Sequence, residues 1–179
     1  ADGGEGRQGV PPQGIDGAGG EGQPLVHQGD HGVAAVGGAA GFAAAGLQLR
    51  DECARLMAAQ GHPEPNGRAK LTRGYNLPAR YVLHTVGPIV GRWVTWKDRQ
   101  ELAACYRSCL ELVAEHSLRS VAFCCISTGE FHFPNREAAE IAVKTVREFL
   151  TGNATIERVI FNVFKDIDAE IYRRLLESD

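Results

Sequence analysis

The sequence predicts an α/β protein, a three-layer α/β/α sandwich around a mixed, largely parallel central sheet. Short segments rich in β-branched and aromatic residues alternate with long amphipathic helices along the chain. The run Val121–Ile126 is apolar and uncharged, as is typical of a strand buried on both faces of a parallel sheet. A chain of 179 residues is long enough to bury a substantial core within one domain.

Residues 1 to about 46 differ in composition from the rest of the chain. They contain 15 of the 22 glycines and a single aromatic residue, Phe42. Because such a segment buries little apolar surface, we expect residues 1–24 to be disordered and residues 25–179 to form the domain, with its N-terminal part incomplete. Only Leu25–Asp30 has the pattern of a strand ending in a turn, and Gly37–Ala45 is either a flexible connection or an extension of the next helix.

The elements from Leu47 onwards follow from hydrophobic periodicity and from the positions of glycine and proline. His84 lies within a predicted strand, where a hydrogen-bonded core histidine is a more probable role than a catalytic one. Strands are predicted at Ala69–Thr72, Tyr81–Val86, Ser120–Ile126 and Arg158–Phe164, and helices at Leu47–Gln60 (with Leu47 on its apolar face), at Lys97–Glu115, from the N-cap Asn135 to Gly152, and at Asp166–Glu177 (with Ile167 facing inwards).

Composition excludes several classes of function. A formal net charge of −3 argues against general nucleic-acid binding, and no apolar run approaches the roughly 20 residues that span a membrane. No secretory signal pattern is present. The five cysteines, an odd number mostly on apolar faces, are typical of reduced thiols, so we expect a cytoplasmic protein. Cys105 and Cys109 share a helix face, where core packing is favoured over metal binding.

The segment after the apolar run Val121–Ile126 is a candidate ligand loop. It changes abruptly to small polar residues, Ser127–Glu130, and a helix starts soon after Pro134. In open α/β sheets such loops at the carboxyl ends of strands line the ligand crevice. Consecutive N–H groups, two hydroxyls and a glycine suit an anion such as a phosphate or diphosphate. A plain turn without a ligand is an equally good interpretation of the spacing alone.

Three separated motifs resemble one known family, the macrodomains. These are His84–Pro88, Cys125–Phe131 and Phe161–Phe164, which occur in the order that the family has. The resemblance extends from about Ala45 to the C-terminus. It implies the macrodomain form of the α/β/α sandwich, with ADP-ribose or an ADP-ribosylated protein as the partner.

A narrower resemblance is to the zinc-containing branch of microbial macrodomains that hydrolyse protein-linked ADP-ribose. Gly61–Pro65 and Gly129–Pro134 are similar to that branch in particular. Carried over residue by residue, the resemblance implies a loop for the diphosphate and proximal ribose, an aromatic side chain against adenine, a pocket-shaping neighbour and a carboxylate for the adenine amino group. These are, in turn, Ser127, Thr128, Gly129, Glu130 and Phe131 for the loop, then Phe164, Asn162 and Asp30.

The chain departs from that branch before Leu47. There the family carries an asparagine-rich stretch that includes the catalytic asparagine, and the zinc branch adds Cys, His and Cys ligands. Between Asp30 and Leu47 this chain has one histidine, His31, and no cysteine, which is too few ligands for a zinc site. No catalytic residue is therefore assigned, and neither a metal nor a cofactor is expected. A frame error or rearrangement upstream of Ala45 is a hypothesis that accounts for the change.

Three functional interpretations remain open from the sequence. The first is a hydrolase that removes ADP-ribose from modified proteins. The second is a non-catalytic module that binds ADP-ribose or a related nucleotide. The third is the impaired product of a disrupted gene, which would not fold stably because an incomplete sheet leaves an uncovered edge.

Overall fold

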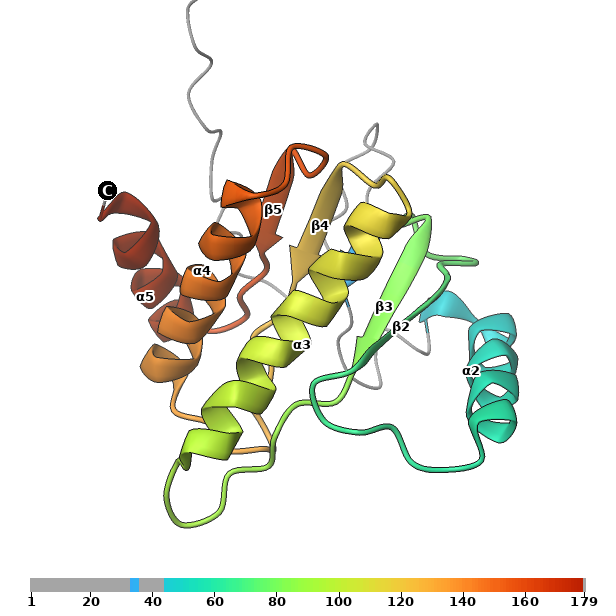
Figure 1. Ribbon diagram of the computed structural model, residues 1–179, viewed down its shortest axis with the longest axis horizontal. Helices are drawn as coiled ribbons and strands as arrows, with labels where there is room; N and C mark the ends of the chain where they lie inside the picture. The colour runs from blue at the N-terminus through green and yellow to red at the C-terminus, as the bar shows by residue number, and fades with distance from the viewer. Residues whose placement is uncertain (1–32, 36–43, 179) are drawn as a thin grey trace, which may run out of the picture.

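The computed structural model describes residues 33–35 and 44–178 (Figure 1). The predicted strand Leu25–Asp30, the candidate site residue Asp30 and the segment 1–24 lie outside these residues. The elements are β1 (Val33–Ala35), α2 (Leu47–Gln60), β2 (Ala69–Arg73), β3 (Tyr81–Thr85), α3 (Trp96–Glu115), β4 (Ser120–Phe123), α4 (Asn135–Thr151), β5 (Arg158–Phe161) and α5 (Asp166–Glu177).

The described strands form one sheet in the order β2-β3-β1-β4-β5. β1 is parallel to both β3 and β4, and β5 is parallel to β4. β2 is antiparallel to β3 at one edge. The prediction of an α/β fold with a mixed, largely parallel sheet is therefore confirmed.

Strand β1 was missed by the sequence analysis, which found no strand between Asp30 and Leu47. Val33 pairs with Tyr81 on one side and with Val121 on the other, so this short segment lies at the centre of the sheet. Three residues among glycines and alanines carry too little hydrophobic pattern to be recognised. Backbone pairing with both neighbouring strands, rather than local propensity, accounts for the strand.

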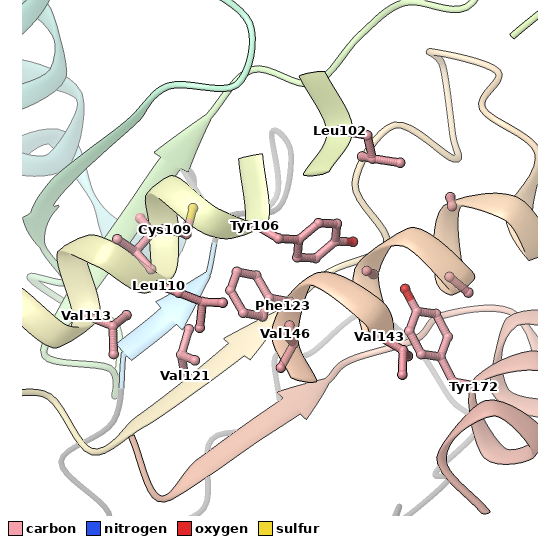
Figure 2. Close-up of a cluster of buried hydrophobic side chains, with 14 of the residues drawn as sticks. Leu102, Tyr106, Cys109, Leu110, Val113, Val121, Phe123, Val143, Val146 and Tyr172 are labelled. Carbon is pink, nitrogen blue, oxygen red and sulfur yellow. The ribbon is translucent and has the colours of Figure 1, made fainter. Parts of the chain in front are cut away.

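Helices α3 and α4 cover one face of the sheet, and α5 packs beside α4 (Figure 1). Figure 2 shows the core between this helical layer and the strands, with Tyr106 of α3 against Phe123 of β4 at a ring-centroid distance of 5.1 Å. The start of α3 is fixed by a capping box, in which the Thr95 hydroxyl accepts from the Asp98 N–H and the Asp98 carboxylate accepts from the Thr95 N–H. The packing of the helices against the sheet and the capping box at the start of α3 therefore favour the same helix.

Helix α2 covers the opposite face of the β2–β3 edge. Leu71 and Leu83 point into the core beneath α3. Lys70 and His84, their neighbours along the strands, instead line a cavity that α2 closes. Because successive side chains of a strand point to opposite faces, the three-layer arrangement follows.

Several boundaries differ from the predictions. β4 ends at Phe123 and β5 at Phe161, so both strands are shorter than their apolar runs. Asn135 is the first residue of α4 rather than its cap, because its side chain is turned to a partner on α5. Leu47 is 72% exposed and Ile167 is 62% exposed, so neither faces the core. None of the helices in the described part of the chain combines the length and apolar character needed to cross a bilayer.

The order of the strands places a crevice next to β4. After β1 the chain passes through α2 to β2 and β3 on one side, whereas after β4 it passes through α4 to β5 on the other side. β1 and β4 are neighbours, so the direction of the connections reverses between them. Ligands of open α/β sheets bind at the carboxyl ends of strands at such a reversal. The segment 124–134, which follows β4, lies at this position.

Candidate functional site

The segment after β4 is a compact loop held by its own hydrogen bonds. The Phe133 N–H donates to the Ser127 carbonyl at 2.9 Å, and the His132 N–H donates to the Gly129 carbonyl at 3.0 Å. The Thr128 hydroxyl donates to the Cys125 carbonyl at 3.1 Å. These bonds close Ser127–Phe131 into a turn whose shape does not depend on a ligand.

Ser127 is the most constrained residue of this loop. Its φ of 65° lies in the left-handed region, which is uncommon for a residue other than glycine. Its hydroxyl oxygen is buried and has no hydrogen-bond partner among the described residues. A Cβ atom on Gly87 would lie 2.1 Å from that oxygen, so the β3–α3 connection has to carry glycine there. Buried hydroxyls normally have a hydrogen-bond partner, so this oxygen is a group that a water molecule or a ligand oxygen would satisfy after a small movement of the loop.

The next three residues present backbone N–H groups. The N–H groups of Gly129, Glu130 and Phe131 donate to no acceptor within the described part of the chain. A Cβ atom on Gly129 would meet nothing within 4 Å, so open space lies over this residue. Because Gly129 has no side chain, the surface over the neighbouring N–H groups stays open. Adjacent N–H groups beside an open surface are a typical anion site.

The loop is attached to the β3–α3 connection. The Val90 N–H donates to the Phe131 carbonyl at 2.9 Å, next to the contact between Gly87 and Ser127. Glu130 is exposed and Phe131 is half-buried. The five predicted loop residues are therefore brought together in one turn at the carboxyl end of β4.

Asn162 and Phe164 lie at the carboxyl end of the neighbouring strand. The Asn162 N–H donates to the Phe123 carbonyl at 2.7 Å, which extends the pairing between β4 and β5. Because β5 ends at Phe161, the two residues belong to its connection with α5 and not to the predicted strand Arg158–Phe164. Phe164 is 87% exposed, so its ring is accessible at the same edge of the sheet as the loop.

Two features of this edge were missed by the sequence analysis. The first is the close packing of Gly87 on Ser127, for which the Gly87–Pro88 pair was the available signal. The second is a hydrogen bond of 2.5 Å from Asn135 Nδ2 to Asp168 Oδ1, which joins the first turns of α4 and α5. Asp168 and Tyr172 are spaced to share one helix face, but nothing in the sequence pairs either residue with α4.

The cysteines beside the loop are not nucleophiles. Burial raises the pKa of Cys124 to about 11 and the pKa of Cys125 to about 12. Cys109 is also buried, and burial raises its pKa further. Because the thiolate is the reactive form, these side chains stay neutral at physiological pH and act as small apolar groups.

The prediction for His84 is supported by its contacts. Its Nε2 atom lies 2.8 Å from the Thr72 hydroxyl oxygen and 3.9 Å from the Cys53 sulfur. Burial lowers the pKa of His84, and the Glu52 carboxylate opposes this effect. The imidazole is therefore a neutral, hydrogen-bonded group on the α2 side of the sheet.

The donor set does not fit a zinc site of the kind that the resemblance implied. Among the described residues, no three His, Cys, Asp or Glu side chains lie together in a way that could hold a metal ion. The interval between Asp30 and Leu47 supplies one histidine, His31, and no cysteine. A structural or catalytic zinc site needs at least three protein ligands.

Relatives of known activity match the part of the chain that carries this site. A Protein-ADP-ribose hydrolase of Staphylococcus aureus is 53% identical over 136 residues, which is 75% of this chain and 51% of that protein. The Xenopus laevis ADP-ribose glycohydrolase MACROD2 is 47% identical over 136 residues, which is 75% of this chain and 31% of that protein. The chain thus spans about half the length of the first relative and less than a third of the second.

The fold of this chain is also that of solved macrodomain structures. A solved structure of an Oceanobacillus iheyensis macrodomain mutant with ADPR superposes with a TM-score of 0.76 at 34% identity, over 84% of this chain and 86% of that chain. The family model of the Macro domain matches residues 28–142, which include α2, α3, β4 and the loop Ser127–Phe131. With more than half of its residues matched by that model, the chain belongs to the Macro domain family.

Proposed function

We propose that this chain binds ADP-ribose, with the diphosphate on the loop Ser127–Phe131. The observation that carries the proposal is the set of consecutive N–H groups of Gly129, Glu130 and Phe131 beside the open space over Gly129. A diphosphate presents several oxygens that such donors bind at once. The buried Ser127 hydroxyl supplies a further polar group at the same place.

The adenine end of the ligand would lie towards the connection after β5. Phe164 offers an exposed ring there, and stacking of a base on such a ring contributes about 1–3 kcal/mol. Asn162 borders the same connection. The names of the relatives support the ligand class, because one relative is a Protein-ADP-ribose hydrolase and one solved neighbour carries ADPR.

We further propose hydrolysis of ADP-ribose from modified proteins as the activity of the protein to which this chain belongs. The support is the name of the Staphylococcus aureus relative, of which the chain covers about half. The described residues supply binding and orientation of the diphosphate, and orientation alone lowers a reaction barrier substantially. No step is assigned to zinc, because the residues present do not fit it, and we expect the chain to act without a metal.

A second function, a binding module without turnover, is favoured by a specific observation. The loop Ser127–Phe131 is among the described residues, whereas these residues contain no group of His, Cys, Asp or Glu side chains that could hold a metal ion. Neutral, free thiols throughout the described part of the chain suit a reducing compartment, so we propose a cytoplasmic location for either function.

The experiment is a calorimetric titration of the whole chain with ADP-ribose, with ADP and ribose 5-phosphate as half-ligand controls. We expect saturable binding of ADP-ribose and weaker binding of each half. A second assay follows release of ADP-ribose from a modified protein. Release would support the hydrolase, binding without release would support the module, and absence of both with a cooperative melting transition would contradict the proposed function.

A further inference from the structure

We propose that Asn135 and Asp168 are positioning residues that fix the loop Ser127–Phe131 relative to the Phe164 side of the crevice. The inference rests on the proposed function, because it concerns affinity at that same site. Asn135 Nδ2 donates to Asp168 Oδ1 at 2.5 Å, and Asp168 is only 4% exposed. A buried, charge-assisted hydrogen bond of this kind is strong and directional.

Asn135 and Asp168 lie at the starts of the helices that follow the two proposed ligand-binding connections, β4–α4 and β5–α5. Asn135 is the first residue of α4, directly after the loop that follows β4. Asp168 is in the first turn of α5, directly after the connection that carries Phe164. The hydrogen bond therefore joins the ends of two segments that approach the ligand from neighbouring strands.

Asp168 also interacts electrostatically with Cys125, which follows β4 in the chain. Burial is the main cause of the raised pKa of Cys125, and the negative charge of the Asp168 carboxylate is the next cause. In the first turn of α5 the positive end of the helix dipole favours a carboxylate. The Asn135 amide adds a donor that a lone buried carboxylate would lack.

Ring contacts hold the same elements without setting the spacing of the loops, whereas the hydrogen bond from the Asn162 N–H to the Phe123 carbonyl fixes only the first residues beyond β4 and β5. Tyr172 of α5 stacks on Phe161 at 4.8 Å between ring centroids, and Phe161 stacks on Phe123 at 6.4 Å. Apolar ring contacts tolerate small sliding, whereas a hydrogen bond fixes distance and direction. On its other side the loop is tied to Val90, which belongs to the β3–α3 connection.

A ligand that spans both connections depends on their spacing, and a ligand that touches one does not. ADP-ribose would contact the loop with its diphosphate and Phe164 with its adenine. Adenosine would reach only the Phe164 side. A displacement of about 1 Å between two binding groups is enough to weaken a spanning ligand strongly. Weakening the Asn135–Asp168 hydrogen bond should therefore lower the affinity for ADP-ribose more than the affinity for adenosine.

The test is an exchange of the two side chains in the whole chain. Asn135→Asp alone places two carboxylates against each other, and the double variant Asn135→Asp with Asp168→Asn restores an amide opposite a carboxylate. Glu137→Gln is the matched control, because Glu137 also lies at the start of α4 but binds Arg99 of α3 at 2.5 Å. Affinity for ADP-ribose is measured by calorimetry, affinity for adenosine by NMR titration, and stability by urea unfolding.

We expect Asn135→Asp to weaken ADP-ribose binding about tenfold or more and adenosine binding by less than about twofold. The double variant should return to within about threefold of the wild type, and Glu137→Gln should not change either affinity. Unchanged ADP-ribose affinity in Asn135→Asp would overturn the inference while leaving the proposed function intact. Loss without recovery in the double variant would also overturn it, because the new carboxylate would then act directly on the diphosphate.

Wild-type protein that melts cooperatively but binds no ADP-ribose would overturn the proposed function and this inference together. Should Asn135→Asp not fold, Asp168→Asn alone replaces it, because an amide pair keeps one weaker hydrogen bond. That variant should lose about threefold in ADP-ribose affinity. An Asp168→Asn protein that binds as tightly as the wild type would contradict the role of the pair.

Discussion

The two helical layers of this domain are packed very differently. Helices α3 and α4 each bury six side chains against the sheet and against each other. Helix α2, on the opposite face, buries a single residue, Leu49. Beneath α2 lies a cavity of about 550 Å³, bordered by Cys53 and Met57 of the helix and by Thr72 and His84 of the sheet. The loop Ser127–Phe131 is thus attached to the layer that holds the core, next to α4 rather than α2.

The difference in packing indicates which layer contributes most to the stability of the domain. Burial of apolar surface contributes roughly 25 cal/mol per Å², so the layer of α3 and α4 supplies most of the driving force for folding among the described residues. An open cavity under α2 contributes few dispersion contacts. Substitutions should therefore separate into large effects on the α3–α4 side and small effects on the α2 side.

The largest effect is expected from Phe123→Ala. Phe123 is fully buried and contacts Tyr106, so its loss leaves a cavity in the dense layer. We expect the free energy of unfolding to fall by about 3–5 kcal/mol. Leu56→Ala, beside the cavity under α2, is the matched control and should cost less than about 1 kcal/mol. Urea unfolding of both variants measures the contrast, and equal losses would mean that the two layers are equally packed.

The next effect tests the loop without disturbing the layer that supports it. Gly129→Glu places bulk and negative charge in the open space over the loop, and repulsion of a diphosphate at about 4 Å costs roughly 4 kcal/mol. Affinity for ADP-ribose should fall at least about 100-fold while cooperative melting is retained. Glu130 is exposed, and we expect its carboxylate to point away from the ligand, so Glu130→Gln should change affinity by less than about threefold. Equal affinity of wild type and Gly129→Glu would place the ligand elsewhere.

A smaller, pH-dependent effect belongs to the α2 side. Burial lowers the pKa of His84 below its ordinary value of 6.5, so the unfolded chain binds a proton first as the pH falls. Stability is therefore full above pH 6.5 and decreases below it, by at most about 1.4 kcal/mol per pH unit from this group. Urea unfolding of the wild type and of His84→Gln at pH 7.5 and 5.5 measures the contribution of His84 to the pH dependence of stability. A wild type that is no more acid-sensitive than His84→Gln would show that His84 is solvated.

The smallest effect is expected on removal of metal. A zinc ion held by the segment before α2 would stabilise the loosely packed side, and a chelator would then lower the melting temperature. Because that segment has two histidines, His27 and His31, and no cysteine, it offers fewer than the usual zinc ligands, and we expect a change of less than about 1 °C on adding a chelator. Elemental analysis of the same sample provides the control, and one tightly held zinc per chain would contradict the expectation.

The sequence alone predicted the α3–α4 side of the sheet better than the α2 side. On the dense side, long periodic patterns predicted α3, α4 and α5, and the change from an apolar run to Ser127–Glu130 predicted a loop after β4, for which ligand binding stays a prediction. On the other side, the exposure of Leu47 was not predicted, because α2 carries apolar residues that its loose packing does not bury. The Asn135–Asp168 pair depends on how α4 packs on α5, and no local pattern encodes a contact between helices.

Strand β1 has a consequence for how the domain assembles. It comes first among the described strands, yet its two partners, β3 and β4, are synthesised dozens of residues later. Until all three meet, β3 and β4 face each other across a slot one strand wide, and each exposes a row of unpaired backbone groups. Pairings between segments so distant in the chain form slowly, and open strand edges recruit other chains. Assembly of the sheet around β1 is therefore the step at which folding competes with aggregation.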